Sequence, residues 1–195
     1  MGRDETPSAG QLLEANHTAL LLIDLQEKLV PHIYERERVL RNASLLIRLA
    51  RILDLPILLT TQYAKGLGPT VQEIRALLPD VMPLDKPTFG CFDSDSFLQV
   101  LRRLPSGINT LVLAGIETHI CVTQTVLGAL QNGYFVHIAS DATSSRAEHN
   151  WRVGLSRMEK AGALISSTEM VIYELLGRSD SAQFKQMLPF LKDQS

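Results

Sequence analysis

The chain has 195 residues, the size of one domain that can bury a core without disulfide staples. A hydrophobic content of 45% and a charged content of 21% are ordinary for a globular protein, and the net charge of -2 excludes the basic surface that nucleic-acid binding requires. No apolar stretch reaches the length of a membrane span or of a signal-peptide core. Two cysteines suit a reducing compartment, so we expect a cytoplasmic protein without membrane or nucleic-acid partners.

Residues 1–17 are polar and lack periodicity, so we expect a flexible N-terminal leader followed by one domain over residues 18–195. Beyond the leader, short apolar runs alternate with segments in which apolar residues recur at helical spacing. In chain order they predict a strand at 19–24, a helix at about 31–53, a strand at 56–60, a weaker strand at 81–84 that contains Pro83, a helix at about 94–104, a strand at 110–114, a helix at about 118–131, a strand at 134–139, a helix at about 147–160, a strand at 163–166, and helices at 169–176 and about 181–191.

This alternation predicts a three-layer α/β/α, Rossmann-like single domain with a mainly parallel sheet of about six strands. In such folds the site lies outside the carboxyl ends of the strands, at the switch point of strand order. The residues that follow predicted strands there are Asp24, Gln62, Tyr63, Lys86 and Cys121.

Each of the charged or reactive candidates has a purely structural reading. An Asp after a strand is often a turn residue, a loop Lys is usually solvated, and a single Cys on a helix is more often core. Together they fit amide hydrolysis: a thiol attacks, a carboxylate moves its proton, and an ammonium and a helix N-terminus favour negative charge. We therefore expect Asp24, Lys86 and Cys121 to converge in one cleft, with the cation and the helix lowering the pKa of the thiol and the carboxylate opposing them.

Four motifs carry a resemblance to a known family: LLIDLQ, KPTFGCF, LAGIETHICVTQT and SDATSSR. With them the chain resembles the isochorismatase-like cysteine hydrolases from about Thr18 to its last helix. Within that superfamily TTQYAKGLGPT and the C-terminal GALISSTEMVIYELLGR are most similar to the isochorismatase domain-containing proteins.

The resemblance implies roles at matched positions. Asp24 would be the general acid/base, Lys86 the polarising cation and Cys121 the nucleophile. It also implies a cis peptide bond between Ile116 and Glu117, which helps to aim backbone N–H groups at the oxyanion.

Departures from relatives narrow the expected reaction. Nicotinamidases carry an Asp-x-His metal motif after the second strand, where this chain reads TTQYAKGLGPT without a His, so we expect no metal and no other cofactor. True isochorismatases cleave a vinyl ether and typically lack the cysteine, so Cys121 disfavours that reaction.

Other residues near the motifs have weaker assignments. Gln62, Tyr63 and Phe92 are candidates for the substrate pocket. His119 could serve as a base for the cysteine, although a packed or exposed His is the commoner case. Cys91 could pair with Cys121 in a redox switch if the two lay within disulfide reach, and we expect it to be the less reactive thiol.

The sequence thus predicts a metal-independent cysteine hydrolase of a small amide or related C–N bond, acting as a homo-oligomer on a small-molecule substrate. Two alternatives stay open. One is a non-catalytic oligomeric binding or scaffold protein with a relict site, and the other is a vinyl-ether hydrolase. A further alternative is a thiol-redox protein, which would need Cys91 within disulfide reach of Cys121.

Overall fold

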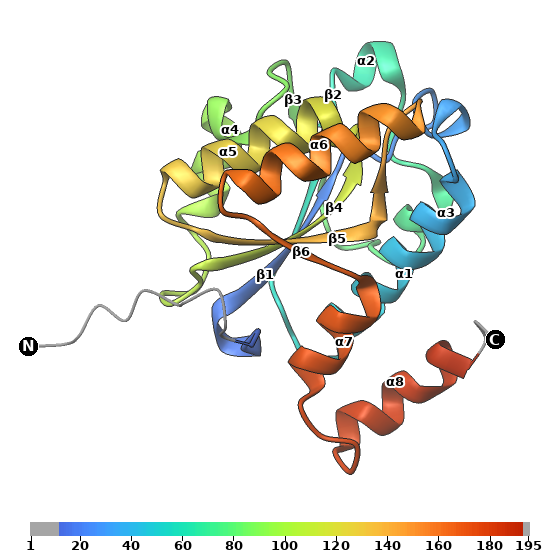
Figure 1. Cartoon of the computed structure of the whole chain (residues 1–195), viewed down its shortest axis with the longest axis vertical. Helices are drawn as coiled ribbons and strands as arrows, with labels where there is room; N and C mark the ends of the chain where they lie inside the picture. Colours follow the sequence, from blue (N-terminus) through green and yellow to red (C-terminus); the bar gives the residue numbers. More distant parts are fainter. Residues whose placement is uncertain (1–11, 193–195) are drawn as a thin grey trace, which may run out of the picture.

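The structure, a computed structural model, describes residues 12–192 and shows one sheet between two layers of helices (Figure 1). All six strands are parallel. The strands are β1 (Thr18–Ile23), β2 (Ile57–Gln62), β3 (Leu84–Lys86), β4 (Thr110–Ile116), β5 (Phe135–Ser144) and β6 (Leu164–Ser166). The α-helices are α1 (Arg36–Ile52), α2 (Ala64–Leu67), α3 (Gln72–Arg75), α4 (Asp95–Leu101), α5 (Thr123–Gln131), α6 (Glu148–Lys160), α7 (Thr168–Leu176) and α8 (Ala182–Lys192).

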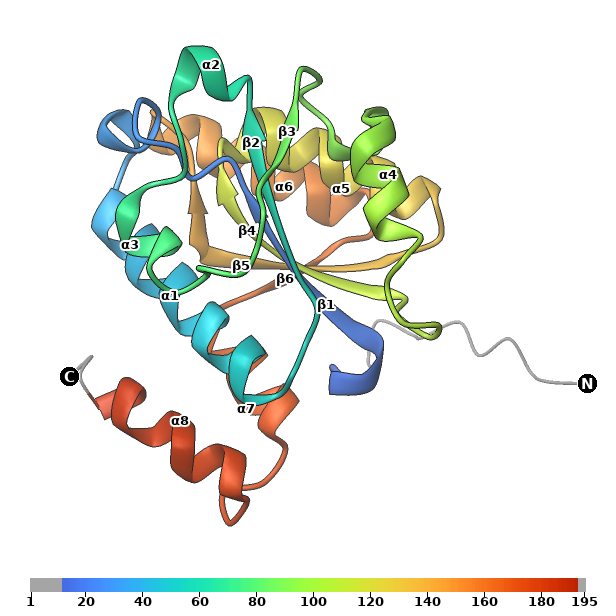
Figure 2. The ribbon, with the colours of Figure 1, turned by 180° about the vertical axis from the view of Figure 1, so that it is seen from behind.

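The strand order is β3-β2-β1-β4-β5-β6, which confirms the expected Rossmann-like architecture. The chain starts in the middle of the sheet, builds outward through β2 and β3, and then returns to place β4 on the other side of β1. Connections therefore leave the carboxyl ends of β1 and β4 in opposite directions. The carboxyl ends of β1 and β4 are therefore the switch point of the sheet, and they lie at the top of Figures 1 and 2.

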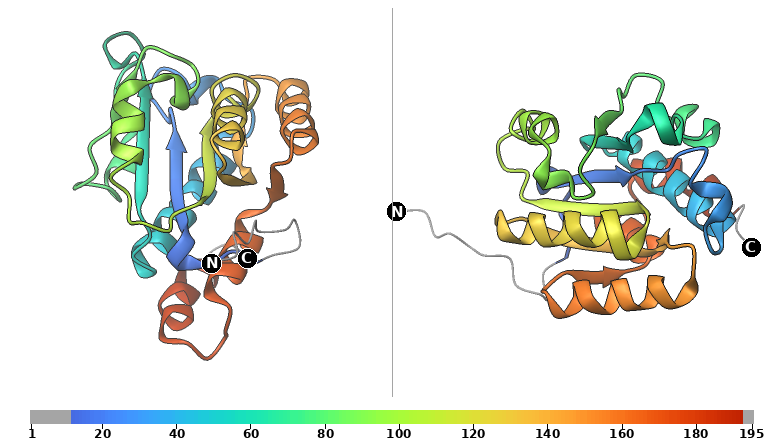
Figure 3. Two further views of the ribbon diagram at one scale, coloured as in Figure 1. Left: turned by 90° about the vertical axis from the view of Figure 1, so that its left-hand side faces the viewer. Right: turned by 90° about the horizontal axis from the view of Figure 1, so that it is seen from above.

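β1 and β4 carry apolar side chains on both faces of the sheet, so each face has its own hydrophobic core. This is also why both strands are continuous apolar runs in the sequence. On one face α1 and α7 pack with α3 and α8, and on the other lie α4, α5 and α6. Figure 3 shows the sheet between these layers. Helix α8 lies beside α1, where the Arg48 guanidinium stacks 4.3 Å from the Phe190 ring centroid.

Several boundaries differ from the sequence prediction. The third strand begins at Leu84, after Pro83, since proline has no N–H to offer a ladder. Helix α1 begins at Arg36 because Glu35, at a φ of 50°, has a left-handed backbone conformation that a right-handed helix cannot contain. Strand β5 continues to Ser144, where the polar residues of the SDATSSR motif pair with the end of β4 after a register shift.

Two short helices, α2 and α3, were not expected; they occupy the connection between β2 and β3. Of the proposed leader, residues 1–11 lie outside the described residues. Leu13 is buried against the α1 core and its backbone N–H donates to Glu174 at 3.2 Å, so the packed structure begins before Thr18. Within residues 12–192 no helix is long and apolar enough to cross a membrane.

Candidate active site

The switch point between β1 and β4 is built around close backbone contact. Gly115, near the end of β4, has a φ of 125°, and a Cβ there would collide with the backbone of Ile23 in β1. Asp24 follows at a φ of 54°, a conformation that Asp adopts more readily than most residues. The chain thus turns away from the sheet at Asp24, which leaves its carboxylate at the carboxyl edge.

Asp24 and Lys86 form a fully buried ion pair. The Lys86 Nζ lies 2.8 Å from the Asp24 Oδ2, and the two side chains are 1% and 0% exposed. The Thr60 hydroxyl donates to the Asp24 Oδ1 at 2.8 Å, so both carboxylate oxygens have a donor. Removing both charges of this pair from water costs free energy, and their mutual attraction and hydrogen bonds must offset that cost.

Cys121 lies beside this pair, in a π-helical turn (Thr118–Val122) that precedes α5. The Val122 N–H donates to the Glu117 carbonyl at 3.2 Å, five residues back, and the Thr123 hydroxyl donates to the Thr118 carbonyl at 2.6 Å. Cys121 is 7% exposed, and its thiol lies close enough to Asp24 and Lys86 for both charges to act on its pKa. The three residues expected to converge are therefore in one cluster at the carboxyl edge.

The electrostatics of Cys121 differ from the expectation of a lowered pKa. Burial, followed by the charge of Asp24, raises the pKa of Cys121 to about 12, against a smaller lowering effect of Lys86. Desolvation and the adjacent carboxylate outweigh the cation. A pKa this high means that the sulfur is a neutral thiol near neutral pH.

Cys91 lies closer to the ion pair than the sequence suggested. It is completely buried, and its backbone N–H donates to the Thr125 hydroxyl at 3.1 Å. Burial raises the pKa of the Cys91 thiol to about 11, which Lys86 partly opposes. Both cysteines are free thiols.

The peptide bond between Ile116 and Glu117 is cis, at the position that the resemblance implied. The Glu117 carboxylate accepts from the Arg146 backbone N–H at 3.0 Å and from its side-chain Nε at 3.1 Å. His119 Nδ1 lies 2.9 Å from the hydroxyl of Ser145, the residue that follows β5. The hydrogen bond of its ring is therefore made to this serine.

The three pocket candidates lie in different settings. Gln62 is 8% exposed and its side-chain amide is bonded to Lys86 and Pro87 within the chain. Tyr63 is 56% exposed at the start of α2. Phe92 is partly buried and packs edge-on against Phe97 and Tyr134 at centroid distances of 5.4 and 5.9 Å, beside the core on the α5 side of the sheet.

Sequence reasoning missed three residues of this region. Thr60 supports Asp24, Gln26 bonds the backbone of Gln62, and Phe89 is 54% exposed while its carbonyl accepts from Lys86 at 3.2 Å. For Thr60 and Gln26 a signal existed: a polar side chain at the end of an apolar strand must find a buried partner.

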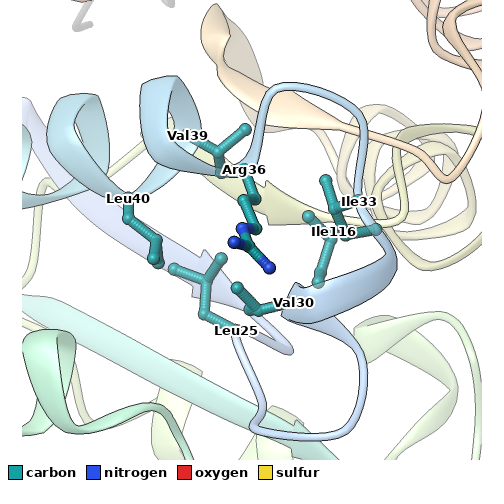
Figure 4. A pocket seen from close by; sticks show the side chains of 7 residues that line it. All are labelled: Leu25, Val30, Ile33, Arg36, Val39, Leu40 and Ile116. Atoms are coloured by element: carbon teal, nitrogen blue, oxygen red, sulfur yellow. The ribbon is translucent and has the colours of Figure 1, made fainter.

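An apolar hollow lies near the site but on the other face of the sheet. It is lined by Leu25, Val30, Ile33, Arg36, Val39, Leu40 and Ile116 (Figure 4) and leaves no room for a water molecule. Its buried walls belong to the α1 core, whereas Cys91 and Cys121 belong to the opposite core. None of the three clustered residues lines it, so it is a gap in packing and not the substrate site.

The donor set for metals is sparse. Among residues 12–192, no three His, Cys, Asp or Glu side chains are arranged to hold a metal ion. The site therefore offers a carboxylate, an ammonium and two thiols, a set suited to proton transfer and nucleophilic attack.

Comparison with known proteins shows the family to which the chain belongs. The model of the isochorismatase domain matches residues 18–170. Isochorismatase domain-containing protein 2A of Mus musculus is 37% identical over 186 residues, covering 95% of this chain and 87% of that protein.

Two solved structures share the fold over nearly the whole chain. MAR1 ribonuclease from Caenorhabditis elegans has a TM-score of 0.86 and 33% identity, covering 93% of each chain. The YcaC gene product of Escherichia coli, described as an octameric hydrolase of unknown specificity, has a TM-score of 0.84 and 27% identity over 96% of this chain and 95% of that one. The chain therefore belongs to the isochorismatase family and has its hydrolase fold.

Proposed function

We propose that the protein is a metal-independent cysteine hydrolase that cleaves a small amide or related C–N bond. One observation supports the proposal: the buried Asp24 carboxylate is bonded to the Lys86 ammonium at 2.8 Å, and the Cys121 thiol lies within the influence of both charges. In this proposal Cys121 is the nucleophile, Asp24 its base and Lys86 the charge partner of the base.

The first step starts from the neutral thiol, because the pKa of Cys121 is raised to about 12. As the Cys121 sulfur bonds to the substrate carbonyl carbon, the thiol proton passes to Asp24, and the carbonyl oxygen becomes an oxyanion. Backbone N–H groups that follow the cis peptide Ile116–Glu117 would bind this oxygen, as the family resemblance implies.

The second step reverses the proton transfer. Asp24 returns the proton to the leaving nitrogen, the C–N bond breaks, and the amine departs from a Cys121 thioester. Water then attacks the thioester while Asp24 accepts its proton, and the proton passes to the departing sulfur. The acid product leaves and the starting thiol is restored, so one carboxylate serves as base and acid in turn.

The test is a panel of small amides assayed for ammonia or amine release with wild type, Cys121→Ala and the matched variant Cys91→Ala. We expect cleavage that disappears in Cys121→Ala and persists in Cys91→Ala, whose sulfur is completely buried. Cleavage that persists without Cys121 would reject the mechanism. Binding of amides without turnover by wild type would favour the scaffold reading.

A labelled RNA belongs in the same panel because the relative from C. elegans is called a ribonuclease. We expect no RNA cleavage, since a net charge of -2 does not favour binding to a phosphate backbone.

We also propose a homo-oligomer, on the similarity to the octameric YcaC of E. coli. Light scattering in solution should give a mass that is a multiple of the 21.6 kDa chain. A mass of one chain at micromolar concentration would contradict it. The cytoplasmic location expected from the sequence stays a prediction.

A further inference from the structure

The carboxyl end of β2 is completed by a side chain. Because the chain leaves β1 at Asp24, Gln62 at the end of β2 has no strand beside it on that side. The Gln26 side chain takes this place: its Oε1 accepts from the Gln62 N–H at 2.7 Å, and its Nε2 donates to the Gln62 carbonyl at 3.1 Å and to the Gly68 carbonyl at 2.7 Å. This completely buried amide fixes the backbone of Gln62 as a neighbouring strand would.

The Gln62 side chain is in turn fixed in one orientation. Its Nε2 donates to the Pro87 carbonyl at 2.9 Å, and its Oε1 accepts from the Lys86 Nζ at 3.0 Å. A flipped amide would set its NH₂ group against the ammonium and its oxygen against a carbonyl, so only this orientation satisfies both neighbours. Gln62 therefore presents one acceptor to Lys86 and has both polar ends bonded within the chain.

The Lys86 ammonium has three N–H groups and four acceptors around it. They are the Asp24 Oδ2 at 2.8 Å, the Gln62 Oε1 at 3.0 Å, the Phe89 carbonyl at 3.2 Å and the Thr88 carbonyl at 3.3 Å. Every donor of Lys86 is thus directed at the protein. Donating to a substrate oxygen would require breaking one of these buried bonds.

We propose that Gln62, held by Gln26, is a positioning residue that keeps the Lys86 ammonium against Asp24, so that Lys86 serves the reaction through Asp24 and not by contact with substrate. A neutral amide suits this task, because a second carboxylate would compete with Asp24 for the cation. The inference rests on the proposed function, since it assigns these residues to the Asp24–Cys121 pair. It differs from the expectation that Gln62 lines the substrate pocket.

The first test needs no substrate. Iodoacetamide alkylation of Cys121, followed by peptide mapping, is compared in wild type, Gln62→Met and the matched control Gln99→Met, which changes an exposed Gln of α4. We expect Gln62→Met to slow alkylation about tenfold, because a hydrogen bond to a charged group is lost and the cation that lowers the thiol pKa is released from its place. Gln99→Met should match wild type. An equal or faster rate in Gln62→Met would overturn the inference, whereas a wild-type Cys121 that resists alkylation would overturn the proposed function instead.

The second test separates positioning from substrate contact. With an amide that the protein cleaves, Gln62→Met should lower kcat about tenfold and leave KM nearly unchanged, because both polar atoms of the Gln62 side chain are already bonded within the chain. A raised KM with an unchanged kcat would show that Gln62 binds substrate and would reject positioning.

A double-mutant cycle tests the route through Lys86. In a Lys86→Met background, Gln62→Met should have no further effect on alkylation, and fully additive effects would contradict the inference. If Lys86→Met does not fold, the comparison of kcat with KM decides alone.

Discussion

Removing the Lys86 ammonium should destabilise the protein far more than removing a surface charge. In Lys86→Met the side chain keeps much of its volume, but the Asp24 carboxylate, which is 0% exposed, loses its ion pair with Lys86. Breaking one partner of a buried pair costs about 3–5 kcal/mol, because the remaining charge has no water to solvate it. For a domain of this size each kcal/mol lowers Tm by about 2–4 °C, so we expect a decrease of roughly 6–20 °C.

Urea denaturation at neutral pH measures this loss against the control Lys185→Met, an exposed residue of α8 that should change stability by less than about 0.5 kcal/mol. The double variant Asp24→Asn with Lys86→Met removes both charges and should recover much of the loss; Asn is chosen because it tolerates the positive φ of position 24. A loss below about 1 kcal/mol in Lys86→Met would refute the reasoning, since it would mean that water or another cation reaches Asp24.

Three further outcomes are expected. The alkylation rate of Cys121 should rise about tenfold per pH unit from about pH 7 to 10, because a pKa of about 12 leaves a trace of thiolate; a plateau near pH 8 would show an activated thiol. Gly115→Ala should cost more than about 3 kcal/mol by denaturation, because its Cβ meets β1, whereas Gly162→Ala, also at positive φ but with nothing within 4 Å, should cost about 1–2 kcal/mol; equal costs would contradict the close-contact argument. Burial lowers the pKa of His137, so the neutral imidazole stabilises the fold above about pH 6.5. As the pH falls, the unfolded chain takes up the proton before the folded protein does, and stability is lost. His137→Gln should flatten this decline in stability, and an unchanged slope would reject the assignment.

The fold was predictable because parallel strands buried on both faces leave a strong local signal. Runs such as that of β1 contain almost no polar residue, and the helices between strands show a clear apolar face. The sequence prediction is wrong where this periodic apolar pattern is absent. Polar Ser140–Ser144 looked like a loop, although β4 supplies it with strand partners, and the short helices α2 and α3 have too few residues for a periodic pattern.

The site divides in the same way. The positions of Asp24, Lys86 and Cys121 follow from a local rule, that polar residues after parallel strands meet at one edge, together with the family motifs. Which of them contact one another follows from the strand order, which sequence patterns leave open. Thr60 and Gln26 were overlooked because their importance depends on the partner that the fold places beside them.

By itself the sequence determined the class of fold, the edge of the sheet that carries the site and the residue types available there, because these depend on periodicity and spacing along one chain. Only the tertiary structure decided the charge state of Cys121 and the partners of Lys86 and Gln62. The helix and the cation that the sequence places near Cys121 favour thiolate, but burial and the Asp24 carboxylate raise its pKa to about 12. Desolvation and hydrogen bonding are sums over all neighbours in space, most of them distant in sequence, and so they exist only once the chain has folded.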